Sequence, residues 1–99
     1  MKEKELERFE PKGEPIVSFP IQIKHSAIIP FAKDMDKILC ENDHKGGWRD
    51  CPITYLRSRL VEEVGEYFAL VANNEAKGKE AQKELIDIAN FCMMLWDRA

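Results

Sequence analysis

Apolar residues from Phe31 onward recur with the 3.6-residue period of an α-helix. Pro30 precedes the first stripe, and proline suits the first turn of a helix. The stripe consists of Phe31, Met35, Ile38 and Leu39. The pair Gly46-Gly47 then interrupts the pattern after His44. We therefore predict a first helix between Phe31 and this glycine pair.

Two more helices are predicted downstream. Asp50 is a candidate N-cap and Pro52 suits a first turn, so a second helix is expected to run to about Ala76. Its apolar stripe is Ile53, Leu56, Leu60, Val64, Tyr67, Phe68 and Val71. The segment 73–78 reads as a turn, after which a third helix is expected from about Lys79 to Arg98. The pattern predicts an all-α, antiparallel bundle of about three helices per chain.

The first thirty residues differ from the rest. Pro11, Gly13, Pro15, Pro20 and Pro30 interrupt this stretch and exclude a long helix. We predict an extended N-terminal arm over residues 1–30, followed by a helical domain over residues 31–99. Apolar residues alternate in part of the arm, which allows a short strand or a strap along the bundle; they are Ile16, Val17, Phe19, Ile21 and Ile23.

The size of the chain favours assembly with further copies. It has 99 residues, of which 44% are hydrophobic, and a domain of this size buries only about 60 to 65% of its unfolded surface. The predicted third helix is apolar on almost every side, as buried helices are, so Cys92 within it is expected in the core. We expect oligomerisation to complete the bundle, as a homodimer or homotetramer.

Charge and cysteine content narrow the function classes. Lys and Arg number 15 against 18 Asp and Glu, a net charge of -3, which lacks the basic footprint of a nucleic-acid-binding protein. No apolar run approaches the roughly 20 residues of a membrane-spanning helix, and the charged N-terminus has no signal-peptide core. We expect a cytoplasmic protein that binds neither nucleic acid nor membrane, with its three cysteines reduced.

Several acidic residues fall where apolar residues are expected. On a helical wheel Glu63 lies between Leu56 and Leu70, on the apolar face of the second helix. Glu66 lies at the edge of that face, whereas Glu62 points away from it. An interior carboxylate is destabilising by several kcal/mol unless it is compensated, so Glu63 requires a positive charge nearby.

The predicted third helix also carries carboxylates among apolar residues. Glu84 and Asp87 are spaced three apart in its apolar run, with Asn90 one turn further. One source of positive charge is a salt bridge from Arg59, one turn before Glu63. The other is a hard divalent cation held by carboxylate oxygens from two neighbouring helices, for which Mg²⁺ or Mn²⁺ is suited. Both remain open on spacing alone.

A family resemblance bears on this choice. The blocks Glu62-Glu63-Val64-Gly65-Glu66 and Glu84-Leu85-Ile86-Asp87 resemble the EExxE and ExxD signature of the MazG-like, all-α nucleoside triphosphate pyrophosphohydrolases. The segment from Asn42 to Trp48 and the run from Asp87 to Leu95 resemble further parts of that family. Together these blocks cover roughly residues 35 to 97, and residues 1–30 match nothing in it.

The resemblance implies an activity and a set of site residues. The reaction would be Mg²⁺-dependent hydrolysis of a (deoxy)nucleoside triphosphate to the monophosphate and pyrophosphate. Glu63, Glu66, Glu84 and Asp87 would be the metal ligands, with Glu62 less firmly assigned. Either Glu63 or Glu66 would accept a proton from the attacking water.

Four other residues are candidates for substrate binding, each with a structural alternative. Lys45 and Arg49 could contact phosphate oxygens or be solvated surface charges. Trp48 could stack on the base or close the end of the bundle. Asn90 could orient a ligand carboxylate, touch the sugar, or cap a buried backbone group.

Two other functions are also compatible with features of the sequence. Glu41-Asn42-Asp43-His44 is an ExxH motif of the ferritin-like di-iron type, but such sites need two of these motifs and the chain has one. The other rival is a non-enzymatic helical interaction or scaffold module, in which Arg59 and lysines satisfy the carboxylates. A scaffold of that kind predicts no dependence on metal.

Overall fold

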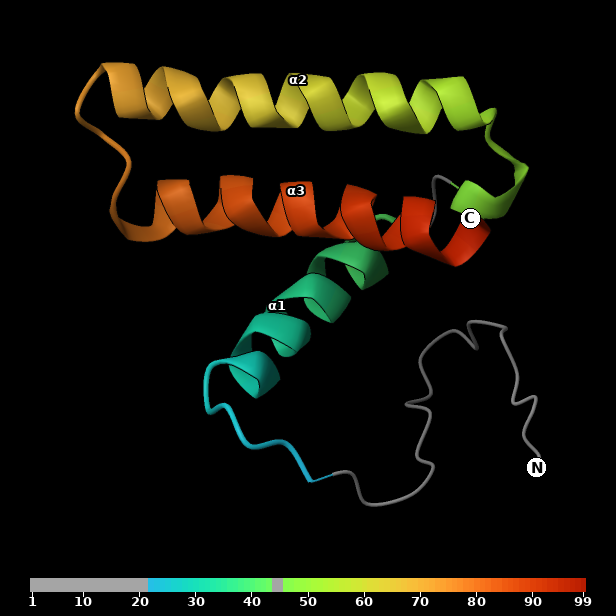
Figure 1. Ribbon diagram of the computed structural model, residues 1–99, viewed down its shortest axis with the longest axis horizontal. Coiled ribbons are helices and arrows are strands. Elements are labelled where there is room, and N and C mark those ends of the chain that lie inside the picture. The colour runs from blue at the N-terminus through green and yellow to red at the C-terminus, as the bar shows by residue number, and fades with distance from the viewer. Residues whose placement is uncertain (1–21, 44–45) are drawn as a thin grey trace.

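The computed structural model describes residues 22–43 and 46–99 (Figure 1). The described elements are α1 (Ile28–Glu41), the 3-10 turn η2 (Trp48–Asp50), α2 (Ile53–Ala72) and α3 (Gly78–Arg98). The all-helical prediction with three α-helices is confirmed, and the described residues contain no strand. Helices α2 and α3 lie side by side and antiparallel, and α1 packs obliquely against α3 (Figure 1). No described helix combines the length and the apolar character needed to cross a membrane.

Helix α1 begins and ends earlier than the sequence pattern predicts. It starts at Ile28, so Pro30 lies in its first turn as predicted. It ends at Glu41, ahead of the glycine pair, where the backbone N–H and the side-chain amide of Asn42 both donate to the carbonyl of Ile38. Of the predicted N-terminal arm, residues 22–27 precede α1 and include exposed Ile23, whereas residues 1–21 lie outside the described part.

Helix α2 departs from the prediction at both ends. Pro52, not Asp50, occupies the N-cap position, and its carbonyl accepts hydrogen bonds from the amides of Tyr55 and Leu56. The helix ends at Ala72 in a Schellman motif. There Asn74 takes a left-handed conformation with φ 58°, and the amides of Asn74 and Glu75 donate to the carbonyls of Val71 and Leu70. The predicted extension to Ala76 is therefore wrong.

The end of α3 anchors the segment that precedes α2. Trp48 Nε1 donates to Asp97 Oδ2 at 3.3 Å, and the Arg49 guanidinium pairs with the same oxygen at 3.2 Å. The Arg98 guanidinium donates to the carbonyls of Trp48 and Cys51. These contacts hold the start of α2 against the last turn of α3, and so determine which residues of the two antiparallel helices face each other.

The apolar core between the helices is small. Its buried apolar members among the described residues are Leu56, Ala81 and Ile86. The expectation that α3 is buried on every side is wrong for the single chain, because Leu85 is 40% and Trp96 74% exposed, and Cys92, expected in the core, is exposed as well. An apolar helix with one solvent-facing side is typical of a subunit surface.

Candidate functional site

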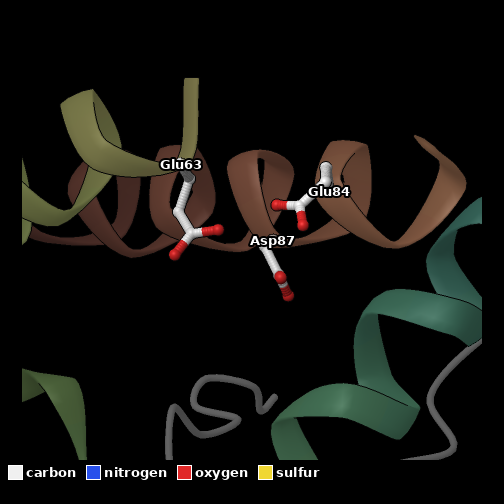
Figure 2. Close-up of side chains that lie close together, drawn as sticks. All are labelled: Glu63, Glu84 and Asp87. Carbon is white, nitrogen blue, oxygen red and sulfur yellow. The ribbon is translucent and has the colours of Figure 1, made fainter. Parts of the chain in front are cut away.

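A cluster of three carboxylates lies between α2 and α3 (Figure 2). Glu63 comes from α2, and Glu84 and Asp87 come from α3. One carboxylate oxygen of each residue lies within 4.8 Å of the others. Glu63 is 4% exposed, Glu84 is 8% exposed, and Asp87 is half-buried. Three of the four predicted metal ligands are therefore close together, and two of them, Glu63 and Glu84, are buried where water can compensate little of their charge.

Two oxygens of this cluster have no hydrogen-bond partner. Glu63 Oε1 and Glu84 Oε1 are both fully enclosed, and neither receives a donor. An unsatisfied buried oxygen is destabilising by about 1 to 3 kcal/mol, and by more when it is charged. The enclosed oxygens of Glu63 and Glu84 therefore require either bound protons or a cation between them.

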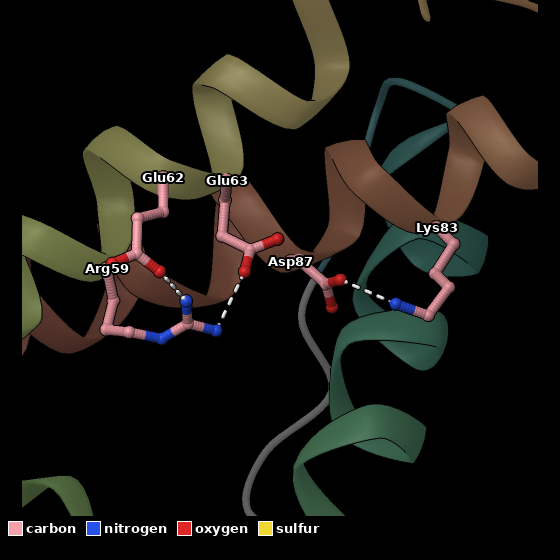
Figure 3. Close-up of polar contacts among 5 residues, drawn as sticks. All are labelled: Arg59, Glu62, Glu63, Lys83 and Asp87. Atoms are coloured by element: carbon pink, nitrogen blue, oxygen red, sulfur yellow. Dashed lines mark hydrogen bonds and ion pairs between the residues drawn. The ribbon is translucent and has the colours of Figure 1, made fainter. Parts of the chain in front are cut away.

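Two basic side chains compensate part of the negative charge (Figure 3). Arg59 Nη2 pairs with Glu63 Oε2 at 2.8 Å, and Arg59 Nη1 pairs with Glu62. Lys83 Nζ pairs with Asp87 Oδ2 at 2.8 Å. The Arg59 salt bridge that the spacing allows is therefore present, but it engages only one oxygen of Glu63. Within the described part of the chain, no ion pair reaches Glu84.

Glu66 lies outside the group of three clustered carboxylates but interacts with two of them, Glu63 and Glu84. It is exposed on α2, one turn after Glu63. Burial raises the pKa of Glu84 to about 7, helped by a side-chain hydrogen bond to Glu66 and by the charge of Glu66. Burial also raises the pKa of Glu63, with further contributions from the charges of Glu66 and Asp87, while Arg59 opposes this rise. Glu66 therefore lies at the rim of the cluster, near its solvent side.

Glu62 and Asn90 take positions consistent with structural alternatives named above. The side chain of Glu62 is 56% exposed and its contact is to Arg59, as expected for a surface charge. Asn90 is 3% exposed, and its Nδ2 donates to the carbonyl of Met35 in α1 at 3.3 Å. Its Oδ1 is buried without a partner. Asn90 thus ties α1 to α3 one turn beyond Asp87.

Trp48 and Arg49, two of the other predicted substrate-binding residues, do not lie at the carboxylates. Trp48 and Arg49 are held by Asp97, which is ten residues beyond Asp87 on α3, or about 15 Å along the helix. Arg49 also stacks on the Trp48 ring, with its Cζ 5.1 Å from the ring centroid. Trp48 therefore closes the end of the bundle, the structural alternative given for it. Lys45 lies outside the described residues, as does His44 of the ExxH motif.

Three polar residues that the sequence analysis did not single out make side-chain contacts in the structure. Lys83 pairs with Asp87 four positions later, a spacing at which oppositely charged side chains meet on a helix. That signal was available in the sequence. Asp97 and Arg98 anchor the segment before α2 through contacts between residues about fifty positions apart. No local pattern indicates such a pairing.

The fold and the cluster define a small all-helical protein with a buried acidic site shared by two helices. No protein-family model matches the sequence, and no solved structure matches the fold. The chain is 34% identical over 67 residues to an uncharacterized protein of Archaeoglobus fulgidus, a match that covers 68% of this chain and 70% of the archaeal protein. The chain belongs to the same family as that protein.

Proposed function

We propose that the protein is a Mg²⁺-dependent nucleoside triphosphate pyrophosphohydrolase. The observation that carries the proposal is the pair of enclosed, unpartnered oxygens of Glu63 and Glu84 beside Asp87. The MazG-like resemblance of the Glu62–Glu66 and Glu84–Asp87 blocks supports it from the sequence, since it names the same carboxylates. An all-helical fold in which α2 and α3 are antiparallel neighbours is the architecture that the resemblance implies.

The donor chemistry fits a hard divalent cation. Glu63, Glu84 and Asp87 would hold it, with Glu66 at the rim as a fourth ligand or as proton acceptor. Mg²⁺ prefers oxygen donors and commonly combines a few carboxylates with water and substrate phosphates, and Mn²⁺ suits the same set. When bound, the cation would neutralise charge on a triphosphate, whose own negative charge repels an attacking water.

The remaining residues have roles in the same proposal. Hydrolysis adds water across the anhydride between the α and β phosphates, so one proton of the water must be accepted nearby. Glu66 is better placed for this than Glu63, because Glu66 is exposed whereas Glu63 is buried and already accepts from Arg59. Trp48 and Arg49 would meet a nucleotide only at a distance from the clustered carboxylates, if at all within one chain.

The salt bridges favour a second candidate function. Arg59 and Lys83 compensate part of the acidic charge without any metal, as a non-enzymatic helical interaction module requires. Mg²⁺ would not raise the Tm of such a module. A metal-free interaction module leaves the enclosed oxygen of Glu84 without a partner. For this reason we favour the enzyme.

Metal binding and turnover test the proposed function directly. A cation at ten times its Kd stabilises the folded state by about 1.4 kcal/mol, which raises the Tm of a chain of this size by roughly 5 to 10 °C. We expect millimolar Mg²⁺ to produce such a rise in metal-stripped protein. With Mg²⁺, a panel of canonical and modified nucleoside triphosphates should release pyrophosphate as first product. An unchanged Tm with no pyrophosphate from any nucleotide would favour the scaffold, and orthophosphate as first product would contradict cleavage between the α and β phosphates.

We further propose that a second copy covers the exposed apolar side chains of α2 and α3. Val61 is 71% and Phe68 60% exposed, and their seven-residue spacing places them on one side of α2. Leu85 and Trp96 add exposed apolar surface on α3. Light scattering during gel filtration should give a mass of at least twice 11.5 kDa. Phe68→Glu should shift the protein toward the monomer, and a monomeric wild type at tens of micromolar would refute the assembly.

A further inference from the structure

The side chain of Arg59 lies at the edge of the acidic cluster and has supports from two helices (Figure 3). Its Nη2 reaches Glu63 Oε2 at 2.8 Å, and its Nη1 reaches Glu62, both on α2. Its Cζ lies 5.2 Å from the centroid of the Phe91 ring on α3. The side chain is 30% exposed, so the guanidinium is held in place but remains accessible from solvent.

The charge around Arg59 accounts for its contact with Glu63. Acidic side chains outnumber basic ones here, the acidic residues being Glu62, Glu63, Glu66, Glu84 and Asp87 and the basic ones Arg59 and Lys83. A divalent cation among Glu63, Glu84 and Asp87 would take over the compensation of Glu63. The attraction between Arg59 and Glu63 would then weaken, since the carboxylate would share its charge with the cation.

A guanidinium released in this way is suited to phosphate. Its planar fork of N–H groups matches two oxygens of a phosphate as well as it matches a carboxylate. The Phe91 ring supports its face through a cation–π contact, so the edge of the guanidinium can change partner while its face remains on the ring. A triphosphate bound to a cation beside Glu63 would bring its charged oxygens close to this edge.

We propose that Arg59 is a substrate-binding residue that exchanges Glu63 for the pyrophosphate portion of the nucleotide when the metal binds. The inference rests on the proposed function and deepens it. Arg59 would bind the two phosphates that leave together, and would bind neither base nor sugar. Arg59 would therefore strengthen the binding of inorganic pyrophosphate and of nucleoside triphosphates, and would not strengthen the binding of nucleoside monophosphates.

The test compares Arg59→Met with Arg57→Met. Arg57 is an exposed arginine on α2, two residues earlier, and belongs to no contact of the cluster. With saturating Mg²⁺, Arg59→Met should weaken binding of inorganic pyrophosphate and raise the KM for the triphosphate by about 10- to 100-fold, as for loss of a hydrogen bond between charged groups. Arg57→Met should leave both values within about twofold of wild type. The Tm rise caused by Mg²⁺ alone should survive in Arg59→Met, because the three clustered carboxylates remain.

The results separate this inference from the proposed function. A wild type that releases no pyrophosphate overturns the proposed function itself. An active wild type whose pyrophosphate affinity is unchanged by Arg59→Met overturns the role of Arg59 alone, as does an equal loss of affinity for nucleoside monophosphate and pyrophosphate. If Arg59→Met fails to fold, Arg59→Lys keeps the charge but lacks the planar fork. It should still weaken pyrophosphate binding several-fold, and wild-type affinity in this variant would refute the exchange.

Discussion

Replacement of Glu63 by glutamine is expected to reduce pyrophosphate release by more than about 100-fold and to remove most of the Mg²⁺-induced rise in Tm. Changes to residues that only orient metal ligands reduce affinity or activity by about 10- to 100-fold, so loss of a ligand itself should have a larger effect. Asp87→Asn should behave in the same way, because Asp87 contributes an oxygen to the same cluster. Initial rates and thermal melts with and without Mg²⁺ measure both effects.

A matched control for these two variants is Glu80→Gln, an exposed carboxylate one turn before Glu84 on α3. It removes one negative charge from α3, the helix that carries Asp87, without touching the cluster, so turnover and the Mg²⁺ response should remain close to wild type. Both site variants should keep a helical circular dichroism spectrum, because the new amide is nearly isosteric with the carboxylate. Near-normal turnover in Glu63→Gln or Asp87→Asn would remove that residue from the site.

The metal-free protein is expected to lose stability as the pH rises from about 5 to 8. Burial raises the pKa of Glu84 from 4.5 in the unfolded chain to about 7 in the fold, so between these values the folded state holds more protons than the unfolded state. The stabilisation is present at the acidic end and is lost as the pH passes through about 7. The raised pKa of Glu63 acts in the same direction, and Lys83 stays charged throughout because a hydrogen bond to Asp87 raises its pKa above 10.5.

Glu84→Gln isolates this effect. The neutral amide cannot be ionised, so the variant should melt at a higher temperature than the wild type at pH 8 and should show a flatter dependence on pH. Mg²⁺ should act in the opposite sense on the wild type, with a larger Tm rise at pH 8 than at pH 6, because ligand carboxylates must be deprotonated. Melting curves in a buffer series, with EDTA or Mg²⁺, measure this. Parallel pH curves for wild type and Glu84→Gln would contradict the assignment of the proton to Glu84.

Periodicity located the helices well because long apolar stripes dominate their local sequence. The predicted third helix agrees with α3 within one residue, since its stripe is continuous and Gly78 begins it. Helix ends depend on local hydrogen bonds and backbone conformations, which the periodicity of apolar residues does not record. The left-handed Asn74 and the amide hydrogen bonds of Asn74 and Glu75 stop α2 four residues early, and α1 ends at Glu41, ahead of the glycine pair.

The acidic cluster could be predicted from the sequence because each helix, taken alone, shows carboxylates among apolar residues. A glutamate on an apolar face, as Glu63 is, stands out on a helical wheel, and the antiparallel pairing of two adjacent helices brings Glu84 and Asp87 to it. The sequence could not decide between the two positions expected for Trp48, because the decision depends on Asp97 at the far end of α3. Whether Trp96 is core or surface depends on what packs against α3, which the sequence of one chain does not contain.

Helix α3 is the element against which the other described elements pack. It supplies two of the three clustered carboxylates, and α2 supplies the third, so α1 has none of them. The amide of Asn90 forms a partly buried polar link between α1 and α3. A change in the tilt of α1 would therefore leave the mutual distances of the three carboxylates intact, because none of them lies on α1. We therefore expect substitutions in α1 to leave the set of carboxylates at the proposed cation site unchanged.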